Sequence, residues 1–69
     1  MRFNYSKLLG KIKECGFSQK QVASAIGINE ATLSAKLNNK FFFSQEEIFA
    51  ICSVLAIHTN EIGDYFYAV

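Results

Sequence analysis

The stretch "SQKQVASAIGINEATLSAKLNN", residues 18–39, decides the fold, because it holds two sets of helix signals on either side of one glycine. Ser18 can cap a helix while Gln21, three residues later, reaches back to it in a capping box. Gly27 then ends that helix, since it has no side chain to resist a positive φ. This first half of the stretch predicts a short helix with defined ends.

The second half of the stretch repeats the pattern at once. Asn29 can cap another helix, and Leu33 and Leu37 are spaced to form one buried stripe along it. A helix that ends at a glycine and is followed directly by a second capped helix must turn a tight corner. The sequence therefore predicts a helix-turn-helix over about residues 18–39, with the second helix projecting from the fold.

Similar signals place three more helices around this pair. Residues 6–15 have apolar side chains at helical spacing, and Gly16 follows them as a left-handed stop. Ser44 and Glu47 form a second capping box, which predicts a helix from Ser44 to Leu55. A short fifth helix is expected from Thr59 or Asn60 to Phe66. The residues predicted to face the core from the first and fourth helices are Leu8, Leu9, Ile12, Cys15, Ile48, Ile51, Cys52 and Leu55.

Length and composition limit the kind of protein. A chain of 69 residues is expected to form one domain, residues 1–69, with too little interior for the cleft of an enzyme. No apolar run approaches the roughly 18 residues of a membrane span, and no signal peptide is visible, so we expect a cytoplasmic protein. The two cysteines and one histidine do not have metal-ligand spacing, so free, mostly buried thiols and no metal or cofactor are expected. The fold predicted is an all-α, compact five-helix bundle.

Charge is divided unevenly along the chain. The first 40 residues hold all seven basic residues and two acidic ones, a net charge of +5, whereas residues 41–69 hold four acidic residues and no basic one. This asymmetry favours a face suited to a polyanion. Lysines that merely solvate exposed helix faces would give the same pattern.

The helix pair resembles the helix-turn-helix of the phage lambda repressor and Cro superfamily. The resemblance rests on Gln19, Ala23, Gly27, Thr32, Leu33 and Ser34, and it extends over nearly the whole chain. It is closest to small Cro-like repressors of phages and prophages of Gram-positive bacteria. The sequence departs from the family pattern at Lys36, where an apolar residue is usual, and at Asn39, where glycine is common and asparagine tolerates the left-handed conformation.

The resemblance implies a sequence-specific regulator of transcription that binds a double-stranded, palindromic or pseudo-palindromic DNA operator as a homodimer. In such a motif the helix 29–38 lies in the major groove and the preceding helix crosses the phosphate backbone. Outward side chains that can reach base edges are Gln19, Glu30, Ala31, Ser34 and Ala35. Contacts to phosphates are predicted for Lys20, Lys36, Asn38, Asn39 and Lys40.

Two aromatic segments favour a protein partner. Phe41–Phe43 could form an exposed recognition patch, although Phe43 also suits a contact that staples the following helix. Tyr65, Phe66 and Tyr67 could form a dimer interface, or they could pack on their own core. A protein-interaction module with the same fold, such as an antitoxin or a modulator of another repressor, is therefore the alternative to a DNA-binding repressor.

Overall fold

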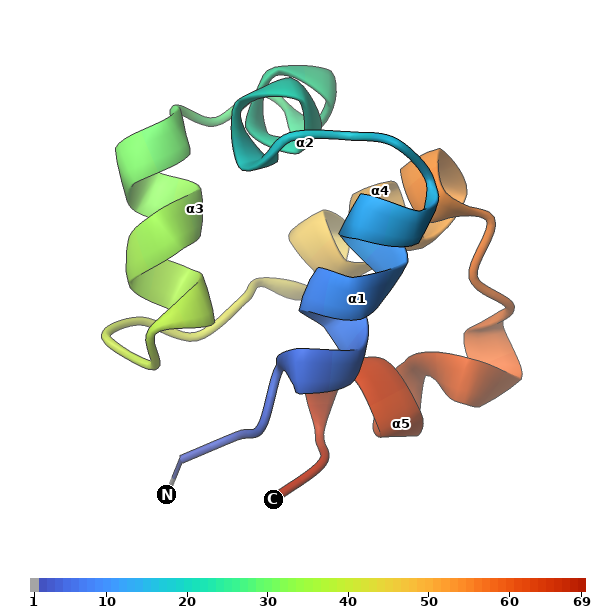
Figure 1. Ribbon diagram of the computed structural model, residues 1–69. Coiled ribbons are helices and arrows are strands. Elements are labelled where there is room, and N and C mark those ends of the chain that lie inside the picture. Colours follow the sequence, from blue (N-terminus) through green and yellow to red (C-terminus); the bar gives the residue numbers. More distant parts are fainter. Residues whose placement is uncertain (1) are drawn as a thin grey trace.

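The computed structural model describes residues 2–69, whose regular structure is entirely helical (Figure 1). The helices are α1 (Ser6–Glu14), α2 (Gln19–Ile26), α3 (Glu30–Leu37), α4 (Gln45–Leu55), the 3-10 helix η1 (Thr59–Glu61) and α5 (Ile62–Phe66). The prediction of an all-α fold with five helices is confirmed. Within residues 2–69 no helix has the length and apolar character needed to cross a membrane.

Both predicted capping boxes are present, at the starts of α2 and α4. The Ser18 hydroxyl accepts a hydrogen bond from the backbone N–H of Gln21 at 3.1 Å, and the Gln21 side chain accepts one from the Ser18 N–H at 2.8 Å. Ser44 and Glu47 make the same two bonds at 3.1 and 2.8 Å. Replacing a capping serine costs about 1 kcal/mol in most proteins, so these local bonds fix where each helix begins.

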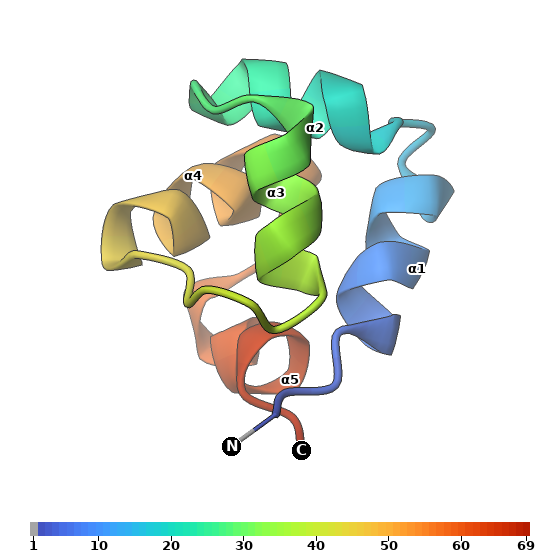
Figure 2. The same cartoon turned by 90° about the vertical axis from the view of Figure 1, so that its left-hand side faces the viewer.

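Residues 27–29 form the corner between α2 and α3. Gly27 has φ 83°, the left-handed conformation predicted for it, and the Asn29 side chain accepts a bond from the Thr32 N–H at 2.7 Å. Figure 2 shows α2 lying across the upper end of α3, which runs away from it along one side of the molecule. The two helices therefore meet at a corner, as the sequence indicates.

One apolar core joins the helices, and it uses a narrower face of α1 than predicted. Leu8 and Ile12 are buried, but Leu9 is 39% exposed and Cys15 is also exposed. Successive residues of a helix are about 100° apart, so Leu9 cannot share the inward direction of Leu8. Cys52 is buried as expected, and burial raises the pKa of its thiol. The predicted inward stripe of α4, which is Ile48, Ile51, Cys52 and Leu55, is buried throughout.

The C-terminal aromatic residues divide between core and surface. Tyr65 and Phe66 are only 7% and 1% exposed, and the Phe66 ring lies 5.6 Å from that of Phe43 in an edge-on arrangement. Of the two alternatives left open by the sequence, packing on their own core is the one observed for Tyr65 and Phe66, so these two rings are not available to a dimer interface. Tyr67, at 54% exposure, is the one residue of the three that faces outward.

Candidate protein-binding and nucleic-acid surfaces

The residues predicted to contact bases lie along α3 and at the start of α2, and we call them the α3 face. Glu30 and Ala31 are exposed, whereas the other three are half-buried. The Ser34 hydroxyl lies 3.4 Å from the side-chain nitrogen of Asn38, which also donates to the Ser34 carbonyl at 2.8 Å. The α3 face consists of Gln19, Glu30, Ala31, Ser34 and Ala35.

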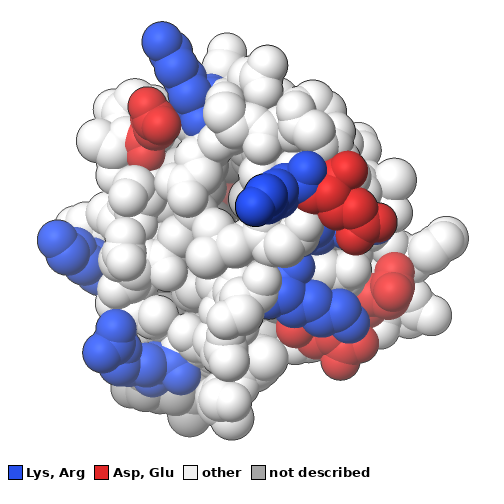
Figure 3. All heavy atoms as spheres, in the orientation of Figure 1, with Lys and Arg blue, Asp and Glu red and all other residues white. Residues whose placement is uncertain are grey.

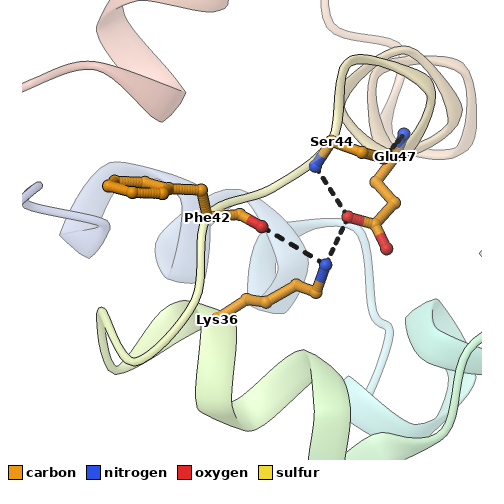
Figure 4. A network of polar contacts seen from close by, with 4 residues as sticks. All are labelled: Lys36, Phe42, Ser44 and Glu47. Atoms are coloured by element: carbon orange, nitrogen blue, oxygen red, sulfur yellow. Dashed lines mark hydrogen bonds and ion pairs between the residues drawn. The ribbon is translucent and has the colours of Figure 1, made fainter.

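Lys36 is not the phosphate contact that the sequence suggested. Its ammonium nitrogen lies 2.6 Å from Glu47 Oε1 and 3.3 Å from the carbonyl oxygen of Phe42, and the same Glu47 oxygen accepts the Ser44 N–H (Figure 4). The side chains of Lys36 and Glu47 are only 12% and 17% exposed. Turning Lys36 toward a phosphate would leave a largely buried carboxylate without its partner, which is costly.

The contacts of Glu47 change the pKa of its carboxyl group. Burial by itself would raise its pKa, but the hydrogen bond from Lys36 and those from Ser44 outweigh burial, so the pKa lies below its ordinary value. The carboxylate thus stays charged, and it joins the end of α3 to the start of α4. The network fixes the loop that carries Phe42.

The side chain of Asn39 is also used for hydrogen bonds within the fold, contrary to the prediction that it binds phosphate. Its Oδ1 accepts the N–H of Phe3 at 2.7 Å and its Nδ2 donates to the carbonyl of Phe3 at 2.9 Å. The backbone N–H of Asn4 also donates to the carbonyl of Ala68 at 2.6 Å. These bonds hold residues 2–5, which we call the N-terminal strap, between the loop after α3 and the C-terminus. Of the predicted phosphate contacts, Lys20, Asn38 and Lys40 remain exposed.

Charges that are separated along the sequence are mixed in space. Lys36 pairs with Glu47, and Lys7 lies 3.7 Å from Asp64, so each ion pair joins the basic part of the chain to the acidic part. On the face drawn in Figure 3, the basic side chains on the left stand apart from one another, whereas those at the upper left and near the centre and right lie beside acidic side chains. A continuous basic patch is therefore not formed on that face.

A second surface is aromatic, and it is formed by Phe3, Phe42, Phe49 and Tyr67. Phe42 is 74% exposed and Phe49 is 47% exposed. Two hollows lie along this aromatic surface, with volumes of about 160 and 270 Å³, and both are lined by Ile48 and Tyr67. The smaller hollow is also lined by Phe3, Tyr5, Phe42, Phe43 and Phe66, and the larger one by Gln45, Phe49 and Ile62.

The rings of the aromatic surface lie over further aromatic rings, and these contacts continue into the core. The ring of Phe3 lies 6.3 Å from that of Phe42 and 5.7 Å from that of Tyr67, both edge-on. Beneath them, Tyr5 contacts Phe43 at 5.5 Å in the same geometry. Edge-on contacts are one of the favourable arrangements of aromatic pairs. Of the run Phe41–Phe43, Phe43 therefore packs inward while Phe41 and Phe42 are exposed.

Sequence reasoning missed Phe3 and Phe49 as members of this surface, and it missed the partners of Lys36 and Asn39. One signal was available, since Lys36 occupies a position that is usually apolar, and a lysine there needs a buried acidic partner. Phe49 gave a weaker signal, as a large ring beside the apolar stripe of an amphipathic helix. Phe3 gave none, because its contacts with Asn39, Phe42 and Tyr67 lie 36 residues or more away in the sequence.

Comparison with known proteins finds a family and a similar solved structure. A family model described as "Protein of unknown function (DUF739)" matches residues 1–69. Among solved structures, the chain is similar to the modulator of repression (MOR) of the temperate bacteriophage TP901-1 from Lactococcus lactis, determined in solution. The two share 40% sequence identity with a TM-score of 0.81, over 97% of this chain and 90% of that chain. No curated protein matches.

Proposed function

The chain belongs to the DUF739 family, and from this premise we propose that it is a phage regulatory protein that modulates repression by binding a repressor protein. The observation that carries the proposal is the likeness to the phage modulator of repression, which extends over nearly the full length of both chains. The function is one of binding, and it needs neither catalysis nor a cofactor.

We assign repressor binding to the aromatic surface. Exposed phenylalanine and tyrosine rings are enriched in protein interfaces, where they bury much apolar area at little entropic cost. Phe42, Phe49 and Tyr67 offer such rings beside hollows that an apolar side chain of the partner can enter. Two of the three lie in or directly beside segments that the sequence already indicated, Phe41–Phe43 and the C-terminal tail.

The test measures binding of the 69-residue chain to the repressor encoded by the phage that carries this gene, by isothermal titration calorimetry. Phe42→Ala and Tyr67→Ala should each weaken binding about 10-fold or more, as interface rings commonly do. Leu9→Ala is the matched control, since Leu9 is a partly exposed apolar residue on α1 that lines neither hollow. No complex with the wild-type chain would overturn the proposed function, and equal binding by all variants would overturn the assignment of the surface.

Sequence-specific binding to double-stranded DNA is a second candidate function. It is favoured by the corner between α2 and α3, and by exposed Glu30 and Ala31 with Lys20 nearby in the sequence. Such a repressor would bind a palindromic or pseudo-palindromic operator as a homodimer, for which Tyr67 is the exposed aromatic residue of the tail. Fluorescence anisotropy with selected and scrambled duplexes at two salt concentrations tests it, because specific binding must prefer one sequence at both.

A further inference from the structure

The side chain of Asn39 binds the N-terminal strap as a neighbouring β-strand would. It satisfies both the N–H and the carbonyl of Phe3, at 2.7 and 2.9 Å, from a residue 36 positions away. Asn39 can do this because it has φ 65°, a left-handed conformation that asparagine adopts more readily than most residues. The pair of bonds is therefore specific to an amide side chain at a left-handed position.

The N-terminal strap includes Phe3, whose ring lies between exposed residues of the aromatic surface. Phe3 contacts both Phe42 and Tyr67, and it lines the smaller hollow with them. Residues 2–5 lie outside regular secondary structure, so their position depends on their hydrogen bonds and packing. Without Asn39, residues 2–5 would keep the bond from Asn4 to Ala68, the bond from the Leu9 N–H to the Tyr5 carbonyl and the burial of Tyr5, but Phe3 would lose both hydrogen bonds of its backbone. The order of the aromatic surface thus depends on a residue outside it.

We infer that Asn39 is a positioning residue for repressor binding: through the strap it holds Phe3 in place, and Phe3 fixes the rings of Phe42 and Tyr67 in the arrangement that the repressor binds. The inference rests on the proposed function. A binding surface that is ordered beforehand avoids the entropic cost of ordering its side chains on binding. For three aromatic rings, losing that order should weaken binding by about 10-fold.

Asn39→Gly is the principal test, because glycine accepts the left-handed backbone while removing both side-chain bonds. Ala56→Gly is the matched control, since Ala56 is the other non-glycine residue with positive φ in residues 2–69, and it lies at the end of α4 away from the strap. Asn39→Asp is a second variant that keeps the acceptor for the Phe3 N–H but turns a carboxylate toward the Phe3 carbonyl. It should release the strap as well.

Two readouts on the full chain decide the matter. Amide hydrogen exchange by NMR should show faster exchange of the Phe3 N–H, by about 10-fold, in Asn39→Gly and not in Ala56→Gly. Calorimetric titration with the repressor of the same phage should show about 10-fold weaker binding for Asn39→Gly and wild-type binding for Ala56→Gly. Wild-type affinity in Asn39→Gly despite faster exchange would overturn the positioning role, and unchanged exchange would overturn the structural basis for it.

A double-mutant cycle separates positioning from a general loss of stability. If Asn39 acts only through Phe3, then adding Asn39→Gly to Phe3→Ala should weaken repressor binding no further. Additive losses would overturn the inference. If the wild-type chain does not bind the repressor, the proposed function fails, and NMR cross-peaks between the Phe3 ring and those of Phe42 and Tyr67 then decide the role of Asn39. Their loss in Asn39→Gly alone would support positioning, and their survival would overturn it.

Discussion

The α3 face and the aromatic surface are assembled in different ways. The α3 face comes from residues 19–35, and its backbone is fixed by caps whose bonds span three residues, such as Ser18 to Gln21 and Asn29 to Thr32. The aromatic surface combines residues near both termini with the loop before α4 and α4 itself. The first surface is therefore a property of two neighbouring helices, whereas the second exists only when the whole chain is folded.

The end of α3 is where the two surfaces meet. Lys36 and Asn39 stand next to the α3 face in the sequence, yet their bonds go to Glu47, Phe42 and Phe3, and so they support the aromatic surface. Proximity in sequence to the predicted helix-turn-helix thus does not assign a residue to its outward face. A polar side chain whose hydrogen bonds are already made within the fold would have to break them to bind an outside ligand.

Phe66 and Tyr67 provide the largest expected contrast, because they are adjacent in sequence but Phe66 is buried in the core whereas Tyr67 is exposed on the aromatic surface. Phe66→Ala removes a ring that is 1% exposed, and it should lower the free energy of unfolding by about 3–5 kcal/mol. A small domain has little more stability than that, so most of the variant should be unfolded. Tyr67→Ala should lower it by less than about 1 kcal/mol.

Urea denaturation followed by circular dichroism at 222 nm checks both variants. The expected difference between the two residues would be contradicted if Tyr67→Ala unfolded the chain as completely as Phe66→Ala does. Tyr67 would then be part of the core in solution, and weak repressor binding by that variant would no longer identify an interface. Leu9→Ala, at 39% exposure on α1, serves as the comparison for losing a partly exposed apolar side chain.

The difference between contacts that are close in sequence and contacts that are distant explains what could be predicted from the sequence. The positions of the first four helices, both capping boxes and the left-handed Gly27 follow from patterns within four residues, and they were predicted correctly. The segment from Thr59 to Phe66 was expected to be one helix, but it is the 3-10 helix η1 followed by α5. The roles of Lys36 and Asn39 depend on partners 11 and 36 residues away, which no local pattern reveals. For Tyr65 and Phe66 the sequence left a dimer interface and core packing as alternatives, because a short apolar tail has the same composition whether it covers its own core or another chain.

The ion pair of Lys36 and Glu47 gives the second prediction. Lys36→Met should lower the free energy of unfolding by about 2 kcal/mol at pH 7, between the values for exposed and fully buried pairs. Glu47→Gln should cost less, because glutamine can still accept the Ser44 N–H and keep the capping box. Urea denaturation of both variants beside the wild type measures the two losses.

The pH dependence of that loss follows from the lowered pKa of Glu47. A carboxyl group whose pKa is lower in the folded state stabilises the fold above its ordinary pKa, here 4.5, and this stabilisation disappears as the pH falls through the lowered value. The difference between wild type and Lys36→Met should therefore be largest near pH 7 and should shrink below pH 4.5. A difference that stays constant down to pH 3 would mean that the pair contributes packing and not charge.

The two capping boxes allow a smaller and sharper comparison. Their bond lengths are the same, so Ser18→Ala and Ser44→Ala should each cost about 1 kcal/mol if caps act only locally. Ser44 differs in that its box partner, Glu47, also holds Lys36. A clearly greater loss of stability for Ser44→Ala in thermal denaturation would show that this cap is coupled to the ion pair, whereas equal losses would show that the two are independent.

Ser34→Ala should have the smallest effect on the fold, and it is the most informative about function. The hydroxyl accepts only a long contact from Asn38, whose stronger bond goes to the Ser34 backbone, so the free energy of unfolding should change by less than about 0.5 kcal/mol. Repressor binding, measured by calorimetry, should remain at the wild-type level. If Ser34→Ala instead weakened repressor binding as much as Phe42→Ala does, the α3 face would be part of the protein interface. Helix α3 would then contribute to repressor binding in two ways. Its outward side chains would contact the repressor, and the bonds of Lys36 and Asn39 at its end would support the aromatic surface.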